Sequence, residues 1–145
     1  MAFEFPLATV LRVRGIIEER EEGVLQKILF DISQTFDGLE CIETQIAESD
    51  AARLADILKP SFGRDLHASY GEVKDLKQRR KELEVQIQKL EQARDVQLLI
   101  YEAARRDREM LTDMRQKKRI AYDSDVSRSE QRILDDNYNA RRGRN

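Results

Sequence analysis

The sequence of 145 residues has little of what compact folds and chemical sites require. It contains one cysteine, one histidine, no tryptophan, two prolines and six glycines, and aromatic residues make up only 6% of it. A single cysteine excludes an internal disulfide and a cysteine-based zinc site, and a chain so poor in turn residues is ill suited to a β-sheet fold. Glycine-rich phosphate loops and dinucleotide motifs are also missing. We therefore expect a protein that is not an enzyme and has no catalytic, cofactor-binding or metal site.

Long hydrophobic runs are missing as well. The longest apolar runs are a handful of residues, far short of the roughly 20 that span a bilayer. The first residues are apolar, but Glu4 and Pro6 interrupt them, which is unlike the uninterrupted apolar region of a signal peptide. We expect a cytoplasmic protein with no direct membrane insertion.

Charge is what the sequence has in abundance, at 37% of residues. Residues 1–60 hold 12 acidic and 6 basic side chains, and the remainder holds 16 acidic and 20 basic ones. The two parts therefore carry opposite net charges, which favours two segments that lie against each other.

Apolar periodicity predicts two long helices. The first covers about 6–59, where apolar residues recur at a mean step of 3.6. These are Ile28, Ile32, Phe36, Leu39, Ile42 and Ile46. The second covers about 72–138, with a heptad pattern whose a and d positions run from Val73 to Tyr122 and are interrupted by arginines. Pro60, Gly63 and Gly71 predict a corner at about 60–71, and the basic tail 139–145 is expected to fray.

The expected fold is all-α: two long helices forming an antiparallel coiled-coil hairpin, in a single domain over 1–145. Two amphipathic helices joined by one corner bury their apolar stripes against each other. A corner at 60–71 places Ile46 opposite Val85, and the acidic run at 18–22 near the arginines at 105–115. Phe3, Phe5 and Leu7 then lie at the open end of the hairpin, where they either cap the hydrophobic seam or enter a partner.

The basic cluster at 115–119 is a candidate nucleic-acid contact. A DNA-reading basic region normally continues into an uninterrupted zipper, whereas here Asp113, Asp123 and Asp125 accompany the cluster. We expect no nucleic-acid partner.

Both ends of the chain resemble FliJ proteins of the bacterial flagellum. The N-terminal pattern FxFxLxxVLxxR is followed by a glutamate-rich stretch, and the segment 101–142 is similar to the C-terminal helix of that family. The resemblance implies a non-enzymatic component of the flagellar type III export apparatus. Such a protein is a coiled coil similar to the central stalk of rotary ATPases, associated peripherally with the inner membrane through the apparatus.

The resemblance also implies partners and contact residues. The partners would be the export ATPase ring (FliI-like), the export-gate protein (FlhA-like) and export chaperones. The ATPase-ring contact would use Phe3, Phe5, Leu7, Val10, Leu11, Arg12 and Arg14. The export-gate contact would use residues at the tip of the hairpin, expected at the surface: Phe62, Leu66, Tyr70, Val73 and Leu76. Two alternatives stay open, the equivalent stalk of a virulence-type secretion system and a structural coiled-coil adaptor without an ATPase partner.

Overall fold

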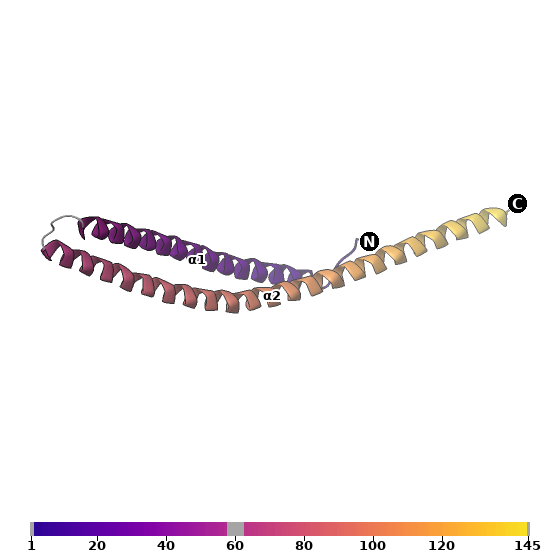
Figure 1. Cartoon of the computed structure of the whole chain (residues 1–145). Helices are drawn as coiled ribbons and strands as arrows, with labels where there is room; N and C mark the ends of the chain where they lie inside the picture. The colour runs from indigo at the N-terminus through magenta and orange to yellow at the C-terminus, as the bar shows by residue number, and fades with distance from the viewer. Residues whose placement is uncertain (1, 58–62, 145) are drawn as a thin grey trace. The chain divides into compact units, whose positions relative to one another are not determined.

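The chain folds into two helices that pack against each other (Figure 1). The computed structural model describes residues 2–57 and 63–144, and for 63–67 it describes the backbone only. Helix α1 covers Ala8–Ile57 and helix α2 covers Gly63–Arg142, and the described residues contain no strand. The prediction of an all-α helical hairpin is confirmed.

Helix α1 begins directly after the apolar N-terminal residues. The backbone N–H of Ala8 donates to the carbonyl oxygen of Phe5 at 3.0 Å, and that of Leu11 to Leu7 at 2.9 Å. Proline is tolerated at such a start because its missing N–H would have no partner inside the helix. The helix then runs without interruption through Gly15, Gly23 and Gly38.

Helix α2 is longer than its sequence pattern predicts at both ends. It begins at Gly63 and ends at Arg142, so the predicted corner of 60–71 is wrong for residues 63–71, and the predicted fraying is wrong for 139–142. One glycine such as Gly71 costs a helix only about 1 kcal/mol relative to alanine, which does not end a helix whose seam continues. Pro60 lies outside the described residues.

Contacts within the chain divide it into two compact units. The first unit comprises Met1–Arg20 with Tyr101–Asn145, and the second comprises Glu21–Ile100. In each unit a stretch of α1 lies alongside a stretch of α2 (Figure 1). The single-domain range of 1–145 stays a prediction.

The second unit is held together by a hydrophobic seam with alternating steps of three and four residues. On α2 the predicted a and d positions from Val73 to Gln97 are all buried or half-buried. On α1 the corresponding residues are Leu25, Ile28, Ile32, Thr35, Leu39, Ile42, Ile46, Ser49 and Arg53. This is the spacing of a coiled coil.

One predicted core residue of α1 lies outside the seam. Phe36 is 46% exposed, and Thr35 is buried in its place. The Thr35 hydroxyl donates to the carbonyl oxygen of Asp31 at 2.8 Å, which satisfies the buried polar group within its own helix. The prediction assumed a period of 3.6 residues, whereas a helix in a coiled coil keeps a period of 3.5.

The register of the two helices also differs from the prediction. A Cβ atom placed on Gly38 would lie 3.9 Å from Cδ1 of Leu83, and Gln97 reaches Glu21. Val85, the predicted partner of Ile46, is half exposed, so this pairing is wrong. The reason is the corner: α2 begins about nine residues earlier than predicted, and every pairing shifts by about that number.

The register can be tested with paired cysteines in a Cys41→Ser background. We expect Gly38→Cys with Leu83→Cys to form a disulfide within one chain under mild oxidation, because a Cβ atom at position 38 would face the side chain of Leu83. The control pair, Ile46→Cys with Val85→Cys, is displaced by about nine residues, or about 13 Å along the helix, beyond the reach of a disulfide. Electrophoresis without reductant measures both. Crosslinking of the control pair alone would contradict the register.

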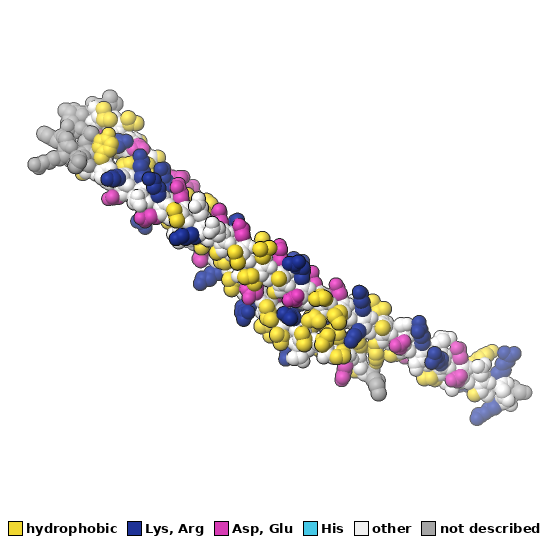
Figure 2. All heavy atoms as spheres, turned by 90° about the horizontal axis from the view of Figure 1, so that it is seen from below, with side chains coloured by type: hydrophobic (Ala, Val, Ile, Leu, Met, Phe, Trp, Pro, Cys, Tyr) yellow, Lys and Arg dark blue, Asp and Glu magenta, His cyan; other side chains and the backbone are white. Residues whose placement is uncertain are grey.

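The seam leaves many apolar side chains at the surface. Among the described residues no side chain is less than 2% exposed, because two helices cover only one side of each other. Figure 2 shows hydrophobic side chains at the surface, lying between acidic and basic ones. Apolar residues outside the seam are therefore available to partners.

Candidate partner-binding surfaces

The N-terminal residues pack onto α2 within the first unit. Phe5 is only 8% exposed, and the ammonium of Lys118 lies 5.8 Å from the centre of its ring. The centres of the Phe3 and Tyr122 rings lie 5.5 Å apart. The guanidinium carbon of Arg119 lies 5.3 Å from the centre of the Phe3 ring. Cations over aromatic faces are attracted by the ring quadrupole. In the structure of the chain without a partner, these residues cap the seam. Whether they also enter a partner stays a prediction.

The rest of the predicted ATPase-ring contact is divided between the seam and the solvent. Leu7 and Leu11 are half-buried, whereas Val10, Arg12 and Arg14 are exposed. Arg14 forms an ion pair with Asp107 at 3.4 Å. The structure thus brings the predicted residues together at the start of α1, with the exposed ones available to a partner. Their role in binding a ring stays a prediction.

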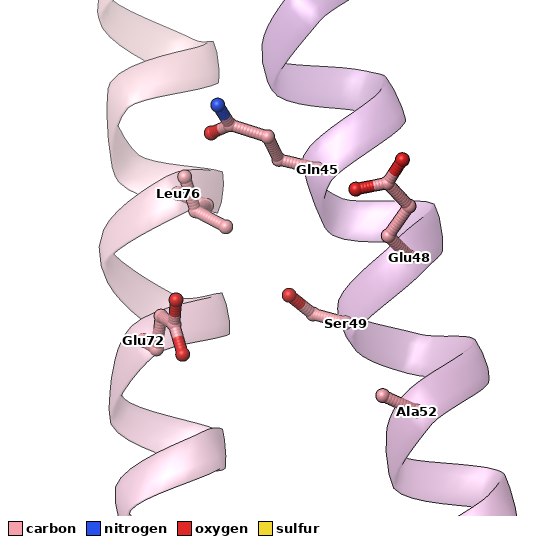
Figure 3. Close-up of a pocket in the computed structure, with 6 residues that line it drawn as sticks. All are labelled: Gln45, Glu48, Ser49, Ala52, Glu72 and Leu76. Carbon is pink, nitrogen blue, oxygen red and sulfur yellow. The ribbon is translucent and has the colours of Figure 1, made fainter.

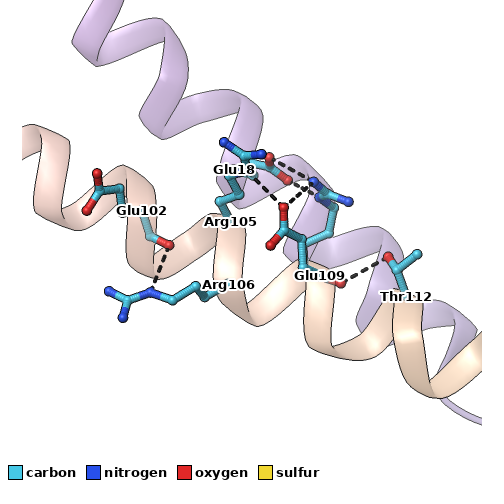
Figure 4. Close-up of polar contacts among 7 residues, drawn as sticks. Glu18, Glu102, Arg105, Arg106, Glu109 and Thr112 are labelled. Atoms are coloured by element: carbon cyan, nitrogen blue, oxygen red, sulfur yellow. Dashed lines mark hydrogen bonds and ion pairs between the residues drawn. The ribbon is translucent and has the colours of Figure 1, made fainter.

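Charged side chains connect the two helices next to this segment (Figure 4). The carboxylate of Glu18 accepts hydrogen bonds from Nε and Nη2 of Arg108, an arginine in a predicted seam position. This hydrogen bond raises the pKa of Arg108 above its ordinary value. Arg105 donates to Glu109 at 2.9 Å, which raises the pKa of Arg105 in the same way. The bidentate geometry orients the two helices more strictly than apolar contacts do.

Beyond these ion pairs α2 has few neighbours in the first unit. Tyr122 is half-buried, and every other described residue from 112 to 144 is exposed. Arg115 and Lys118, both predicted seam positions, are among the exposed residues. The seam therefore ends close to Leu111 apart from the aromatic contact at Tyr122.

The predicted export-gate contact is only partly a surface. Tyr70 is 55% exposed, with the guanidinium of Arg53 4.6 Å from the centre of its ring. Val73 is only 4% exposed, so the expectation that it lies at the surface of the tip is wrong. Since α2 begins at Gly63, Val73 already occupies a seam position almost three turns into the helix. Leu76 is half-buried, while Phe62 and the side chain of Leu66 lie outside the described residues.

A shallow groove between the helices lies in the same unit (Figure 3). Gln45, Glu48, Ser49 and Ala52 line it from α1, and Glu72 and Leu76 line it from α2. Figure 3 shows that Ser49 and Ala52 carry side chains too short to reach α2. Small residues at a seam leave space between helices, which accounts for the groove.

Sequence reasoning missed one exposed apolar group on α1, which comprises Leu29, Phe30 and Phe36. The signal was available: with a strict heptad, Ile28 and Thr35 occupy the seam, and the residues that follow them lie at its edge. A period of 3.6 residues concealed it by placing Phe36 in the core.

The described residues offer no metal site, since no group of three or more histidine, cysteine or carboxylate side chains is arranged to hold an ion. The described part of either helix is also too polar to cross a membrane. Comparison with protein-family models, curated proteins and solved structures gave no match.

Proposed function

We propose that the protein is a non-enzymatic, stalk-like coupling factor of the bacterial flagellar type III export apparatus. It would link the export ATPase ring to the export gate and assist the handling of chaperones and substrates. The observation that carries the proposal is the unit formed by residues 1–20 and 101–145. In it, the FliJ-like N-terminal pattern packs on the FliJ-like C-terminal helix.

The proposed mechanism separates two tasks along the helices. Phe3, Phe5, Leu7, Val10 and Leu11 would enter the ATPase ring, with Arg12 and Arg14 orienting the encounter through their charge. Residues of the second unit would contact the gate. Helix α2, with 80 residues, contributes to both units, and its contour is about 120 Å long at 1.5 Å per residue.

The gate contact would centre on Tyr70, the most accessible described member of its predicted set. Val73 and Leu76 would support it from the seam. An exposed aromatic side chain backed by a rigid helix is a common anchor in protein interfaces. The protein would act in the cytoplasm, peripherally associated with the inner membrane through the apparatus.

Deletion of the gene tests the proposal. We expect the deletion strain to lose swimming motility and to retain flagellar export substrates in the cell, and a plasmid copy of the wild-type gene to restore both. Motility in soft agar and immunoblots of the culture supernatant measure these effects. A motile deletion strain that fails instead to secrete virulence effectors would identify the virulence-type stalk, and one with neither defect would favour the adaptor.

A further inference from the structure

An apolar group lies exposed on the second unit and shares no residue with the surfaces described for the ring and the gate. Phe30 is 62% exposed, and Leu29, Phe36 and Leu98 are each 40–46% exposed. We call these four residues the apolar ridge. Burying a large apolar side chain contributes about 1.5–3 kcal/mol, so these residues, spread over about four turns of the coil, are a substantial potential contact.

The heptad pattern places the ridge on one side of the seam. Leu29 and Phe36 are separated by seven residues, or two helical turns, and each follows a seam residue by one position. Leu98 follows the buried seam residue Gln97 in the same way on α2. In an antiparallel pair, the positions that follow d in both helices flank the same side of the seam. Phe30 follows Leu29 and lies about 100° further round the helix, on its outer face.

Acidic residues border the ridge on both helices, although Lys81 and Lys89 also lie on this stretch of α2. The contacts of Gly38 with Leu83 and of Glu21 with Gln97 set a register that places Glu91 level with Leu29 and Glu84 level with Phe36. Both glutamates occupy the same heptad position as Leu98. On α1, Asp37 and Glu40 follow Phe36 within one turn, and residues 21–57 hold nine acidic side chains against only Lys27 and Arg53.

We propose that the apolar ridge is a docking surface for a positively charged amphipathic helix of a partner protein. Leu29 and Phe36, seven residues apart on α1, and Leu98 on α2 form an apolar row along one side of the seam, against which the apolar stripe of another helix can pack. The carboxylates at its border would pair with lysines or arginines that flank the apolar stripe of the incoming helix.

The same charges disfavour the other occupants. A second copy of the chain placed face to face on the ridge would bring carboxylates together, and like charges across an interface are unfavourable. An anionic membrane surface and a nucleic-acid backbone would meet the same repulsion. The surface does not depend on the proposed export function, because none of its residues belongs to the ring or gate contacts.

Synthetic peptides test the proposal with the full-length chain. The first peptide is a helix with a leucine stripe flanked by lysines, the second carries glutamates in place of the lysines, and the third is a scrambled version of the first. Fluorescence anisotropy at low and high salt measures binding. We expect the lysine peptide to bind much more tightly than either control peptide, and its affinity to fall as salt is added.

Variants of the chain locate the binding. Phe30→Gln with Phe36→Gln is expected to weaken binding of the lysine peptide at least tenfold, and Asp37→Asn with Glu40→Gln to reduce its salt dependence. The matched control is Leu54→Gln on the same helix, a residue 65% exposed and outside the ridge, which should bind like the wild type. Circular dichroism verifies that each variant remains folded, as expected for exposed positions.

Three results would overturn the proposal. The first is that the glutamate or scrambled peptide binds as tightly as the lysine peptide. The second is that the Phe30→Gln, Phe36→Gln variant keeps its affinity for the lysine peptide. The third is a wild-type dimer in sedimentation that this variant dissociates, which would assign the ridge to a second copy of the chain.

Discussion

Replacing Phe3, Phe5 and Leu7 together with serine is expected to abolish stimulation of the export ATPase while the helices remain intact. Full burial of a large apolar side chain contributes about 1.5–3 kcal/mol; Phe5 is already buried in the free chain and Phe3 and Leu7 half-buried, so each gains less than this on binding, but loss of all three anchors still removes most of the affinity. The three residues precede α1, so circular dichroism should change little. ATP hydrolysis by the purified ATPase at increasing concentrations of the variant measures the effect.

The contacts of Phe3 and Phe5 with α2 make this experiment informative. In the free chain the two rings pack near Tyr122 and Lys118, and a ring partner would have to replace these contacts. The control is Arg12→Ala with Arg14→Ala, which should reduce stimulation less and lose its effect in high salt, because exposed charges mainly guide the encounter. Normal stimulation by the triple serine variant would mean that these residues only cap the seam.

Ile87→Ala is expected to lower the free energy of unfolding by about 2 kcal/mol, at the lower end of the range for such substitutions. Ile87 is 6% exposed in the seam, but none of the described side chains is fully buried, so the cavity left behind is partly open to water. The melting temperature should fall by roughly 5–10 °C. Thermal unfolding followed by circular dichroism at 222 nm measures it.

The control for this substitution lies two residues away on the same helix. Val85 is half exposed, so Val85→Ala should change the free energy of unfolding by less than about 0.5 kcal/mol, as is usual for surface positions. Equal losses for Ile87→Ala and Val85→Ala would contradict the seam, since they would mean that both faces of α2 are equally covered.

The sequence predicts α2 and its buried positions well because the heptad is a local property. Once Val73 is assigned to position a, spacing alone identifies Ile87 and Ala104 as core residues, and both are buried. It also places Arg108 at the seam, where the guanidinium of Arg108 donates to the carboxylate of Glu18. Polar seam residues of this kind are tolerated when a partner satisfies them.

What spacing cannot predict is where α2 begins. Pro60 and Gly71 both signal a break, but whether a glycine ends a helix depends on the packing that follows it. An error of about nine residues there moved the predicted partner of Ile46 to an exposed valine and placed Val73 at the surface. Spacing also cannot predict that Phe5 packs on α2, since an apolar end of a chain can either cap its own seam or enter a partner.

The most direct test of the central claim is the effect of the wild-type chain on the cognate export ATPase. Both proteins are purified and mixed over a range of ratios, and ATP hydrolysis is measured together with ring assembly by sedimentation. A coupling stalk predicts that hydrolysis rises with the amount of chain, saturates near one chain per ring, and is accompanied by assembly of the ring. Unchanged hydrolysis and assembly at every ratio, with the chain folded by circular dichroism, would contradict the account and leave a coiled-coil adaptor without an ATPase partner.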